Sequence, residues 1–343
     1  MSFSQFRCIH LDHPTKPQLE LVLREFEHGL QGRSLHETAR RGLHGVESLT
    51  FEEPFPKIES HDAYLYGMLA TPTDIYDGRS EFFNIPFIVN ETMAVTVLWG
   101  PEEHAKDRSA RLFGQICADV KAIATHEKFS EEDPGDVVVR ISRVIVADLQ
   151  ELLKSLHSAV QCAMTEIDSA IFHKQYQSMS SEAANKYEQI SRLKFEILSI
   201  SSTISETQNV FKAISKGDVI IRAPFILRDS DVPPFSTEQK IWIEDLLMRT
   251  RSLKAQRSGL EEEVRLLYER LESLENRRQT AAQMRFAAVA SILLLPALIV
   301  GFFGQNFNIN PWLDAPWAWE ISAGLLAALA ASQWFYFKKK KWF

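Results

Sequence analysis

Two long apolar runs stand near the C-terminal end of the sequence. The first, residues 286–303, contains no charged residue, and the second, residues 317–337, has one carboxylate, Glu320, near its start. Each comes close to the roughly 20 residues that a helix needs to cross about 30 Å of hydrocarbon. Buried core helices are also apolar, but they rarely run so apolar so close together. The pattern therefore predicts transmembrane helices at 284–303 and 317–337.

The charged residues beside these two runs predict their orientation. Lys338–Lys341 follow the second run and Arg277, Arg278 and Arg285 precede the first, whereas the loop 304–316 carries no Lys or Arg. Positive residues next to membrane helices favour the cytoplasmic side. We therefore expect a multi-pass protein of the inner or plasma membrane, with both termini cytoplasmic and the loop outside. No apolar signal segment is recognisable at the N-terminus, so we expect about 280 cytosolic residues.

The first 235 residues combine strand and helix patterns, which predicts an α/β cytosolic domain with a helical part. Alternating and β-branched residues predict one strand near 63–70 and a hairpin over 82–100 with its turn at Asn90-Glu91. Apolar residues at helical spacing predict helices over 18–30, 34–49, 137–172 and 180–214. The last two are long enough to lie antiparallel to each other.

A last helix is predicted to run without interruption from the cytosol into the membrane. Between Thr237 and Phe303 the only glycines are Gly259 and Gly301 and the only proline is Pro296. Ser236 and Gln239 have the spacing of a capping box, which satisfies free amides at a helix start. A continuous helix here has about 67 residues and is roughly 100 Å long. Residues 236–283 would form its cytosolic stalk.

This helix has two distinct faces in the sequence. Leucines recur every seven residues on one face, which predicts a coiled-coil-like seam in need of a partner; they are Leu246, Leu253, Leu260, Leu267 and Leu274, with Val264 and Leu271 between them. A second column lies two positions further round, about 200° away. It is small or apolar in the span and polar below it: Gly301, Ala297, Leu294, Ala290, Ala287, Gln283, Thr280, Asn276, Ser273 and Glu269. Small residues also simply permit close helix packing, but the polar continuation favours a pore lining.

Charge and composition exclude several other classes of function. Outside the spans, their loop and the tail, the chain carries 33 basic and 43 acidic residues, which argues against nucleic-acid binding. The three cysteines, Cys8, Cys117 and Cys162, are widely spaced and typical of reduced cytosolic thiols. No phosphate-binding loop or catalytic motif is present in the sequence, so we expect neither an enzyme, nor an ATP-driven pump, nor a bound cofactor.

Taken together, the C-terminal motifs resemble those of a known family. Gly304-Gln305-Asn306-Phe307 follows a span that contains Pro296, and the chain closes on a Tyr-Phe-Lys-Lys-Lys-Lys-Trp run at 336–342. The segments PKIESHDAYLYGML and NETMAVTV, within 56–97, and the very long helix add to the likeness. The chain resembles the CorA/ZntB superfamily of two-span divalent-cation transporters.

This resemblance implies a homopentameric funnel with an α/β/α cytosolic domain and one long pore helix from each subunit. Gly304, Gln305 and Asn306 would form a selectivity filter, with Asn306 amides accepting hydrogen bonds from a hydrated cation. This suits Mg²⁺, which dehydrates reluctantly. Leu294 would make a hydrophobic gate, and Phe286 is a second candidate.

Departures from the family pattern leave the transported metal open. Gln305 stands where the magnesium branch usually has Met, and Asn308 and Trp312 stand where that branch tends to carry carboxylates. The element Asp314-Ala315-Pro316 is similar to one in the zinc-associated branch. We therefore expect Mg²⁺ or Zn²⁺, with Co²⁺ or Ni²⁺ as further candidates. The alternative is a structural or regulatory membrane paralogue that has lost transport.

Other residues of metal-binding type have ordinary explanations beside the functional one. The cluster Cys8, His10, Asp12 and His13 suggests a zinc-sensing site, but a strand with polar ends also explains it. His61-Asp62 is a weaker pair of the same kind. Glu269 and the run 261–263 would suit cytosolic cation sites, although a solvated helix face explains each of them. The carboxylate of Glu320 lies at the edge of a span. A charge buried there would have a functional role, but the side chain could simply extend to the membrane–water interface.

Overall fold

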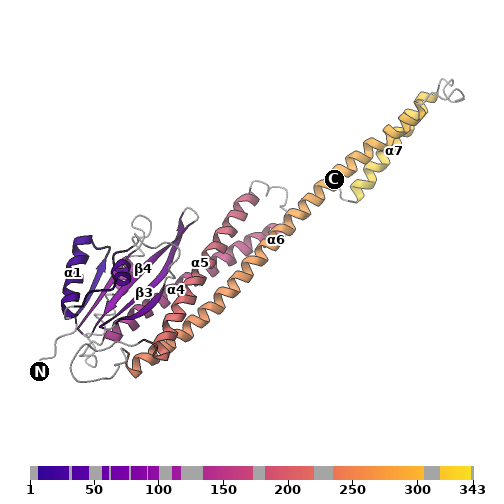
Figure 1. The fold of residues 1–343 in the computed structure, drawn as a ribbon. Helices are drawn as coiled ribbons and strands as arrows, with labels where there is room; N and C mark the ends of the chain where they lie inside the picture. The colour runs from indigo at the N-terminus through magenta and orange to yellow at the C-terminus, as the bar shows by residue number, and fades with distance from the viewer. Residues whose placement is uncertain are drawn as a thin grey trace. The chain divides into compact units, whose positions relative to one another are not determined.

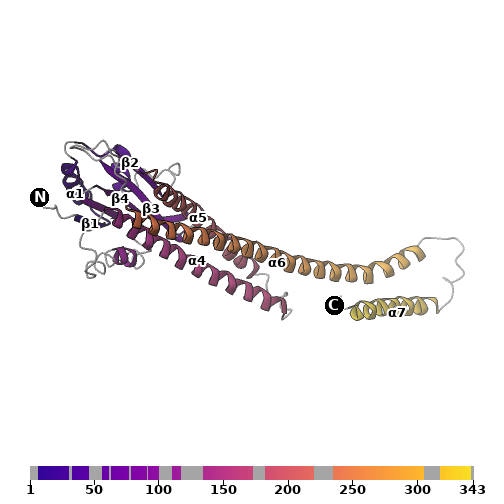
Figure 2. The ribbon, with the colours of Figure 1, turned by 90° about the horizontal axis from the view of Figure 1, so that it is seen from below.

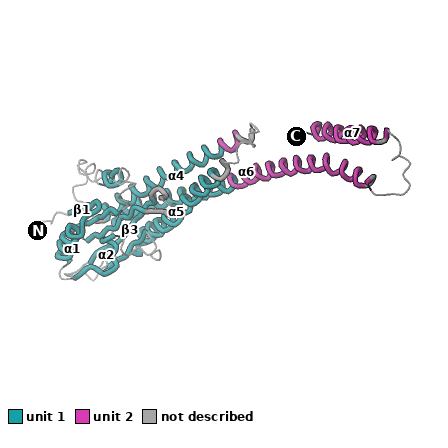
Figure 3. The backbone as a smooth tube through the Cα atoms, turned by 90° about the horizontal axis from the view of Figure 1, so that it is seen from above, with its two compact units in different colours: residues 1–165, 185–266 teal, residues 166–184, 267–343 magenta. Residues whose placement is uncertain are grey.

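The computed structural model describes residues 7–30, 33–45, 56–61, 63–76, 79–90, 92–99, 110–116, 134–172, 182–219, 235–304 and 317–340. The chain divides into two compact units, shown in Figure 3. Unit 1 comprises Met1–Thr165 and Asn185–Leu266, and unit 2 comprises Glu166–Ala184 and Leu267–Phe343.

A five-stranded mixed sheet forms the centre of unit 1 (Figure 1). In chain order its strands are β1 (Arg7–Asp12), β2 (Lys57–His61), β3 (Tyr64–Tyr76), β4 (Arg79–Val89) and β5 (Met93–Leu98). Their order across the sheet is β1-β5-β4-β3-β2, with β1 parallel to β5 and every other pair antiparallel. The sheet confirms the predicted α/β character of the domain.

The predicted strand and hairpin are both present. The strand expected near 63–70 is the first half of β3, which continues to Tyr76, and β4 and β5 form the expected hairpin. The Asn90 side-chain Oδ1 accepts hydrogen bonds from the backbone N–H groups of Thr92, at 2.9 Å, and Met93, at 2.7 Å. An asparagine can hold a tight turn in this way because its short side chain reaches the backbone two residues on. Glu91 lies outside the described residues.

Helices α1 (Lys16–Gly29) and α2 (Glu37–Leu43) cover one face of the sheet. At the start of α1 the backbone N–H of Thr15 donates to Gln18 Oε1 at 2.9 Å, which satisfies one of the free amides there. The apolar core between these helices and the sheet contains Leu19, Leu23, Phe26, Leu43, Tyr64, Tyr66, Ile88 and Val95, all buried. Within the segment 34–49, where glycines interrupt the helical spacing, α2 ends at Leu43, just before Gly45, whose φ of 73° is left-handed; residues 46–49 lie outside the described residues.

Helix α4 (Pro134–Phe172) contributes to the opposite face. The Thr71 hydroxyl on β3 donates to Asp148 Oδ2 on α4, and the side chains that alternate with the first core, such as Leu69 and Phe87, are also buried. The sheet therefore lies between two helical layers, as the predicted α/β/α arrangement requires.

Two further long helices continue the pattern expected from the sequence. Helix α5 (Glu182–Lys216) matches the helix predicted over 180–214, and α6 (Thr237–Phe303) is one helix of 67 residues with Pro296 inside it. The predicted capping box is formed, since Gln239 N–H donates to Ser236 Oγ at 3.2 Å and Ser236 N–H to Gln239 Oε1 at 2.8 Å. Gln239 Nε2 also donates to Asp136 Oδ1 at 2.9 Å, which joins the first turns of α6 and α4.

The leucine seam of α6 finds its partner within the same chain. In unit 1 its members Leu246, Leu253, Leu260 and Val264 are buried, and α4 and α5 lie alongside α6 (Figure 2). Polar contacts flank this packing, with Gln161 on α4 donating to Glu263 at 3.2 Å and Ser215 on α5 donating to Glu244 at 3.1 Å. The seam is thus a three-helix packing surface.

Helix α7 (Ala318–Lys339) is present where the second span was predicted. Among the described residues, one helix meets the length and composition needed to cross a membrane, and it is α6. Its most apolar stretch has only 6% of its residues buried within the chain. A core helix of a soluble protein would be mostly buried, so this surface requires lipid or another chain to cover it.

The seam leads to a stability prediction. We expect Leu260→Ala, at a side chain that is 3% exposed, to destabilise the protein by about 2–5 kcal/mol through the lost apolar contacts and the cavity left behind. Leu266→Ala on the same helix is the matched control, because that leucine is 37% exposed. Thermal unfolding of the detergent-solubilised full chain measures both. Equal midpoints for the two variants would contradict the packing described here.

Candidate functional site

The face of α6 opposite the seam is uncovered. In unit 2 the seam residues Leu267, Leu271 and Leu274 are buried. Every member of the column predicted from the sequence is exposed: Glu269, Ser273, Asn276, Thr280, Gln283, Ala287, Ala290, Leu294, Ala297 and Gly301. One face of the helix therefore packs within the chain while the opposite face is available to something else.

The same uncovered face continues further toward the start of α6 than the sequence analysis traced it. In unit 1 the positions that extend the column are all exposed: Leu266, Glu262, Gly259, Ala255, Ser252 and Met248. A Cβ placed on Gly259 would meet nothing within 4 Å, which confirms that this part of the face is open. These positions could have been found from the sequence, because they keep the alternating spacing of three and four residues that defines the column.

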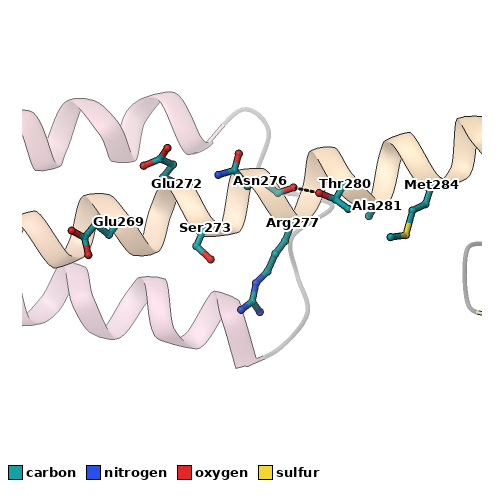
Figure 4. Close-up of a pocket in the computed structure, with 8 residues that line it drawn as sticks. All are labelled: Glu269, Glu272, Ser273, Asn276, Arg277, Thr280, Ala281 and Met284. Carbon is teal, nitrogen blue, oxygen red and sulfur yellow. Dashed lines mark hydrogen bonds between the residues drawn. The ribbon is translucent and has the colours of Figure 1, made fainter.

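The polar part of the column lines a groove of about 550 Å³, shown in Figure 4. Its lining is Glu269, Glu272, Ser273, Asn276, Arg277, Thr280, Ala281 and Met284. The Thr280 hydroxyl donates to the Asn276 backbone carbonyl at 2.8 Å, so that hydroxyl oxygen still has a free lone pair. Carboxylate, hydroxyl and amide oxygens are the groups that hard divalent cations and their hydration shells prefer.

A single chain does not enclose a metal ion in this groove. Within the described parts of the chain, no three His, Cys, Asp or Glu side chains come together in a way that could hold one. The assignment of Glu269 as a metal ligand therefore stays a prediction. Repetition of the groove around an axis would multiply its oxygen atoms, because each copy would add the same set.

The two gate candidates project from the apolar part of α6. The Leu294 side chain is 70% exposed and belongs to the column, whereas Phe286, at 76%, lies one position before Ala287. Phe286 is thus turned about 100° from the column. This difference makes Leu294 the better placed of the two for a constriction on the uncovered face.

Helix α7 covers the other side of this apolar part. Ala288 is fully buried, and Ile292, Pro296 and Ile299 are partly buried, at spacings of four, four and three residues. These positions continue the leucine seam, and Figures 1, 2 and 3 all show α7 running beside this end of α6. In unit 2, α7 thus lies on the side of α6 that carries these residues, whereas residues 275–287 of α6 are all exposed.

Most of the predicted filter lies outside the described residues. Gly304 is described, is exposed and donates its backbone N–H to the Val300 carbonyl at 2.9 Å, which closes the last turn of α6. Gln305 and Asn306 belong to the segment 305–316, which the structure does not describe. Their role at the mouth of a path stays a prediction.

The zinc-sensing alternative near the N-terminus finds no support in the structure. Cys8 Sγ lies 3.3 Å from His10 Nε2, and Asp12 Oδ1 lies 2.6 Å from His13 Nδ1, so the four residues form two separate pairs. His13 follows the strand with a φ of 43°. A strand with polar ends explains these residues, as the sequence favoured.

The remaining acidic candidates have local partners. Glu261 pairs with Arg257 at 2.9 Å, Glu262 with Arg265, and Glu263 accepts from Gln161 at 3.2 Å. The hydrogen bond from Arg265 lowers the pKa of Glu262 below its usual value. These contacts are typical of a solvated helix surface. Glu320, in the first turn of α7, is exposed.

The sequence analysis missed a stacked aromatic group in unit 1. The His61 ring lies 4.6 Å from the Tyr64 ring and 5.3 Å from the His36 ring, both nearly parallel to it. The Tyr64 hydroxyl accepts a hydrogen bond from His36 N–H at 2.7 Å, and burial raises the pKa of Tyr64. No short-range signal connects residues 36 and 61, because the sheet brings them together.

These features define a class of protein: an α/β domain carried on a long helix whose apolar end is suited to a membrane. The chain belongs to the family described as CorA-like Mg²⁺ transporter protein, whose match covers residues 38–339. That range begins in α2 and ends with α7.

Relatives in sequence are similar over a limited stretch. The magnesium transport protein CorA of Haemophilus influenzae is 29% identical over 119 residues, which is 34% of this chain and 36% of that protein. CorA of Pasteurella multocida is 28% identical over 118 residues, with the same coverage. The aligned stretch thus spans about a third of the length of these curated relatives.

Solved structures are similar over nearly the whole chain. The complete CorA magnesium transporter of Methanocaldococcus jannaschii gives a TM-score of 0.73 at 14% identity, covering 100% of this chain and 94% of that one. The full-length CmaX protein gives 0.62 at 12% identity, covering 98% and 88%. At these identities the likeness shows the fold, and it confirms the CorA-like arrangement of an α/β domain and a long helix.

The pair Cys8–His10 leads to a pH prediction. Burial of the imidazole and the nearby charge of Arg140 lower the pKa of His10 from 6.5 to about 4. Between these values the unfolded chain binds a proton that the folded chain does not, so stability falls as the pH drops from about 6.5 toward 4. The loss is roughly 3 kcal/mol at most. We expect His10→Gln to reduce this acid sensitivity in thermal unfolding, whereas the exposed His28→Gln should leave it unchanged. Identical pH profiles for parent and His10→Gln would overturn this assignment.

Proposed function

We propose that this chain is the subunit of a homo-oligomeric membrane path for divalent cations, Mg²⁺ or Zn²⁺ and also Co²⁺ or Ni²⁺. The observation that carries the proposal is the uncovered face of α6, which is oxygen-rich below the span and small within it. Both termini lie in the cytoplasm, and α6 and α7 both cross the inner or plasma membrane. Family membership and the magnesium transport of the named relatives support this function.

A ring of α6 helices explains why one face stays uncovered. If copies assemble around an axis with the column inward, α7 and the seam face outward and each exposed polar side chain faces water in the path. The residues Ala287, Ala290, Ala297 and Gly301 let neighbouring helices approach closely within the span. The resemblance to the CorA/ZntB superfamily implies five copies.

Ion selection would take place at the outer mouth, at Gly304, Gln305 and Asn306. A ring of Asn306 amide oxygens can accept hydrogen bonds from a hydrated cation without removing its water, which suits Mg²⁺ because that ion loses water reluctantly. The neutral Asn308 and Trp312 that follow give the mouth a weaker negative field than carboxylates would. This weaker field is the reason that Zn²⁺ stays beside Mg²⁺ in the proposal.

Passage below the mouth would be controlled by Leu294. A ring of leucine side chains in a narrow path disfavours water, and a dry constriction stops a hydrated ion. If the α6 helices moved apart, water would enter the constriction at Leu294 and a hydrated ion could pass. Below it, the path would continue along Gln283, Thr280 and Asn276 toward the groove at Glu269.

A second candidate function is a membrane-embedded structural or regulatory paralogue that keeps the assembly and has lost transport. The observation in its favour is the sequence at the mouth, with Gln305 and without the carboxylates of the magnesium branch. Flux measurements separate the two candidates.

The filter role predicts a loss of flux. In liposomes that contain the purified full-length chain, we expect Mg²⁺ or Zn²⁺ uptake, and Asn306→Ala should reduce it by tenfold or more because the hydrogen bonds to the hydrated ion are lost. Asn308→Ala, in the same loop, is the matched control and should retain most of the flux. Competition among Mg²⁺, Zn²⁺, Co²⁺ and Ni²⁺ identifies the preferred ion.

Two results would count against these assignments. No flux of any of the four ions, under either a pH gradient or a voltage, would favour the non-transporting paralogue. Undiminished flux in Asn306→Ala would remove that residue from the filter while leaving the transport function standing.

The gate role predicts an opposite effect. Leu294→Ala should raise the basal flux severalfold, because a wider and less apolar ring is wetted more readily. Leu293→Ala is the control, since Leu293 is 67% exposed and lies one position away, about 100° around the helix. Equal flux in the two variants would show that the constriction lies elsewhere.

A further inference from the structure

Five positively charged side chains from two helices come together beside the apolar part of α6. Arg278 and Arg285 precede that part, and Lys338, Lys339 and Lys340 end α7. Figures 1, 2 and 3 show α7 running back along α6, with its C-terminal end next to the stretch of α6 before the apolar run. Both groups belong to unit 2.

Arg278 and Arg285 are both exposed and lie, by helical spacing, on the side of α6 that carries the buried Ala288. Arg278 lies four positions after the seam residue Leu274, and Arg285 lies seven positions after Arg278. The fully buried Ala288 follows three positions later, so these residues share one side of the helix. The last turn of α7, which carries the three lysines, lies next to this stretch of α6. The five cations therefore form one basic cluster, although 53 to 62 positions separate its two halves along the chain.

The described part of the chain supplies little negative charge to this basic cluster. All five side chains are exposed. Glu275 lies one turn before Arg278, and among described residues from 276 onward the only carboxylate is Glu320, at the opposite end of α7. The negative end of the α7 helix dipole, equivalent to about half a charge, offsets only part of the five. The cluster thus retains a strong positive field.

The surroundings of the cluster match a lipid interface more closely than a site for a soluble anion. Trp334, Phe335 and Tyr336, on the last turns of α7, are all exposed, and such aromatic side chains prefer the headgroup level of a bilayer. Apolar residues cover the helix surface on one side of the cluster and charged residues on the other. The phosphate of a phospholipid stands at this boundary.

We propose that Arg278, Arg285, Lys338, Lys339 and Lys340 bind the phosphate groups of anionic phospholipids in the cytoplasmic leaflet. Arginine donates two parallel hydrogen bonds to a phosphate, and lysine adds a point charge. Each basic residue at such a surface strengthens binding about fivefold. The inference concerns this cluster alone and does not depend on transport through the path.

Lipid retention by the full-length assembly tests the proposal. Mixed micelles of dioleoylphosphatidylglycerol and dioleoylphosphatidylcholine are incubated with the purified protein, and native mass spectrometry counts the lipids retained. We expect the parent to prefer the anionic lipid, and K338Q/K339Q/K340Q to lower that preference about tenfold or more. R278Q/R285Q should lower it as well. K338R/K339R/K340R keeps the charge and should restore the preference.

A charge-matched control and a competing anion make the test decisive. K212Q/R251Q/K254Q removes three exposed cations of unit 1 and should leave lipid preference unchanged. An equal loss in this control, or equal retention of both lipids by the parent, would overturn the proposal. Displacement of the lipid by inorganic phosphate, beyond that caused by chloride at the same ionic strength, would show a general anion site instead. Asn306→Ala should retain lipid normally, which separates this proposal from the transport function.

Discussion

The structure depends on one constraint, which is that α6 buries a single face within each of the two units. That face carries the leucine seam against α4 and α5 and then Ala288, Ile292 and Ile299 on the side of α7. Burial of each leucine contributes about 1.5–3 kcal/mol, so rotation of the helix out of this packing is strongly unfavourable. The opposite face is uncovered because the same residues hold the seam inward.

The α/β unit positions the start of this helix. Thr71 and Asp148 join the sheet to α4, and Gln239 joins the first turn of α4, at Asp136, to the first turn of α6. A Cβ on Gly135 would meet the Gln239 side-chain oxygen at 2.3 Å, so a larger residue there would have to displace the Gln239 side chain. The start of α6 is thus tied to the sheet through a short series of hydrogen bonds.

Much of this architecture could be predicted because its signals are local. The seam, the column and the capping box of α6 are periodic or adjacent in sequence, and the β4–β5 hairpin is marked by Asn90. Features that depend on distant residues were missed: the parallel pairing of β1 with β5 and the His36–His61 stack. Glycines interrupt the helical spacing over 34–49, and α2 ends at Leu43, just before Gly45.

Pro296 gives α6 a mechanical property that its sequence periodicity conceals. A proline inside a helix removes the hydrogen bond to the carbonyl four residues earlier, here Ile292, and so weakens the resistance to bending and torsion at that point. Leu294 lies within the turn that lacks this hydrogen bond. Ala297 and Gly301 follow this weakened turn. The apolar part of α6 therefore contains a compliant joint at Pro296.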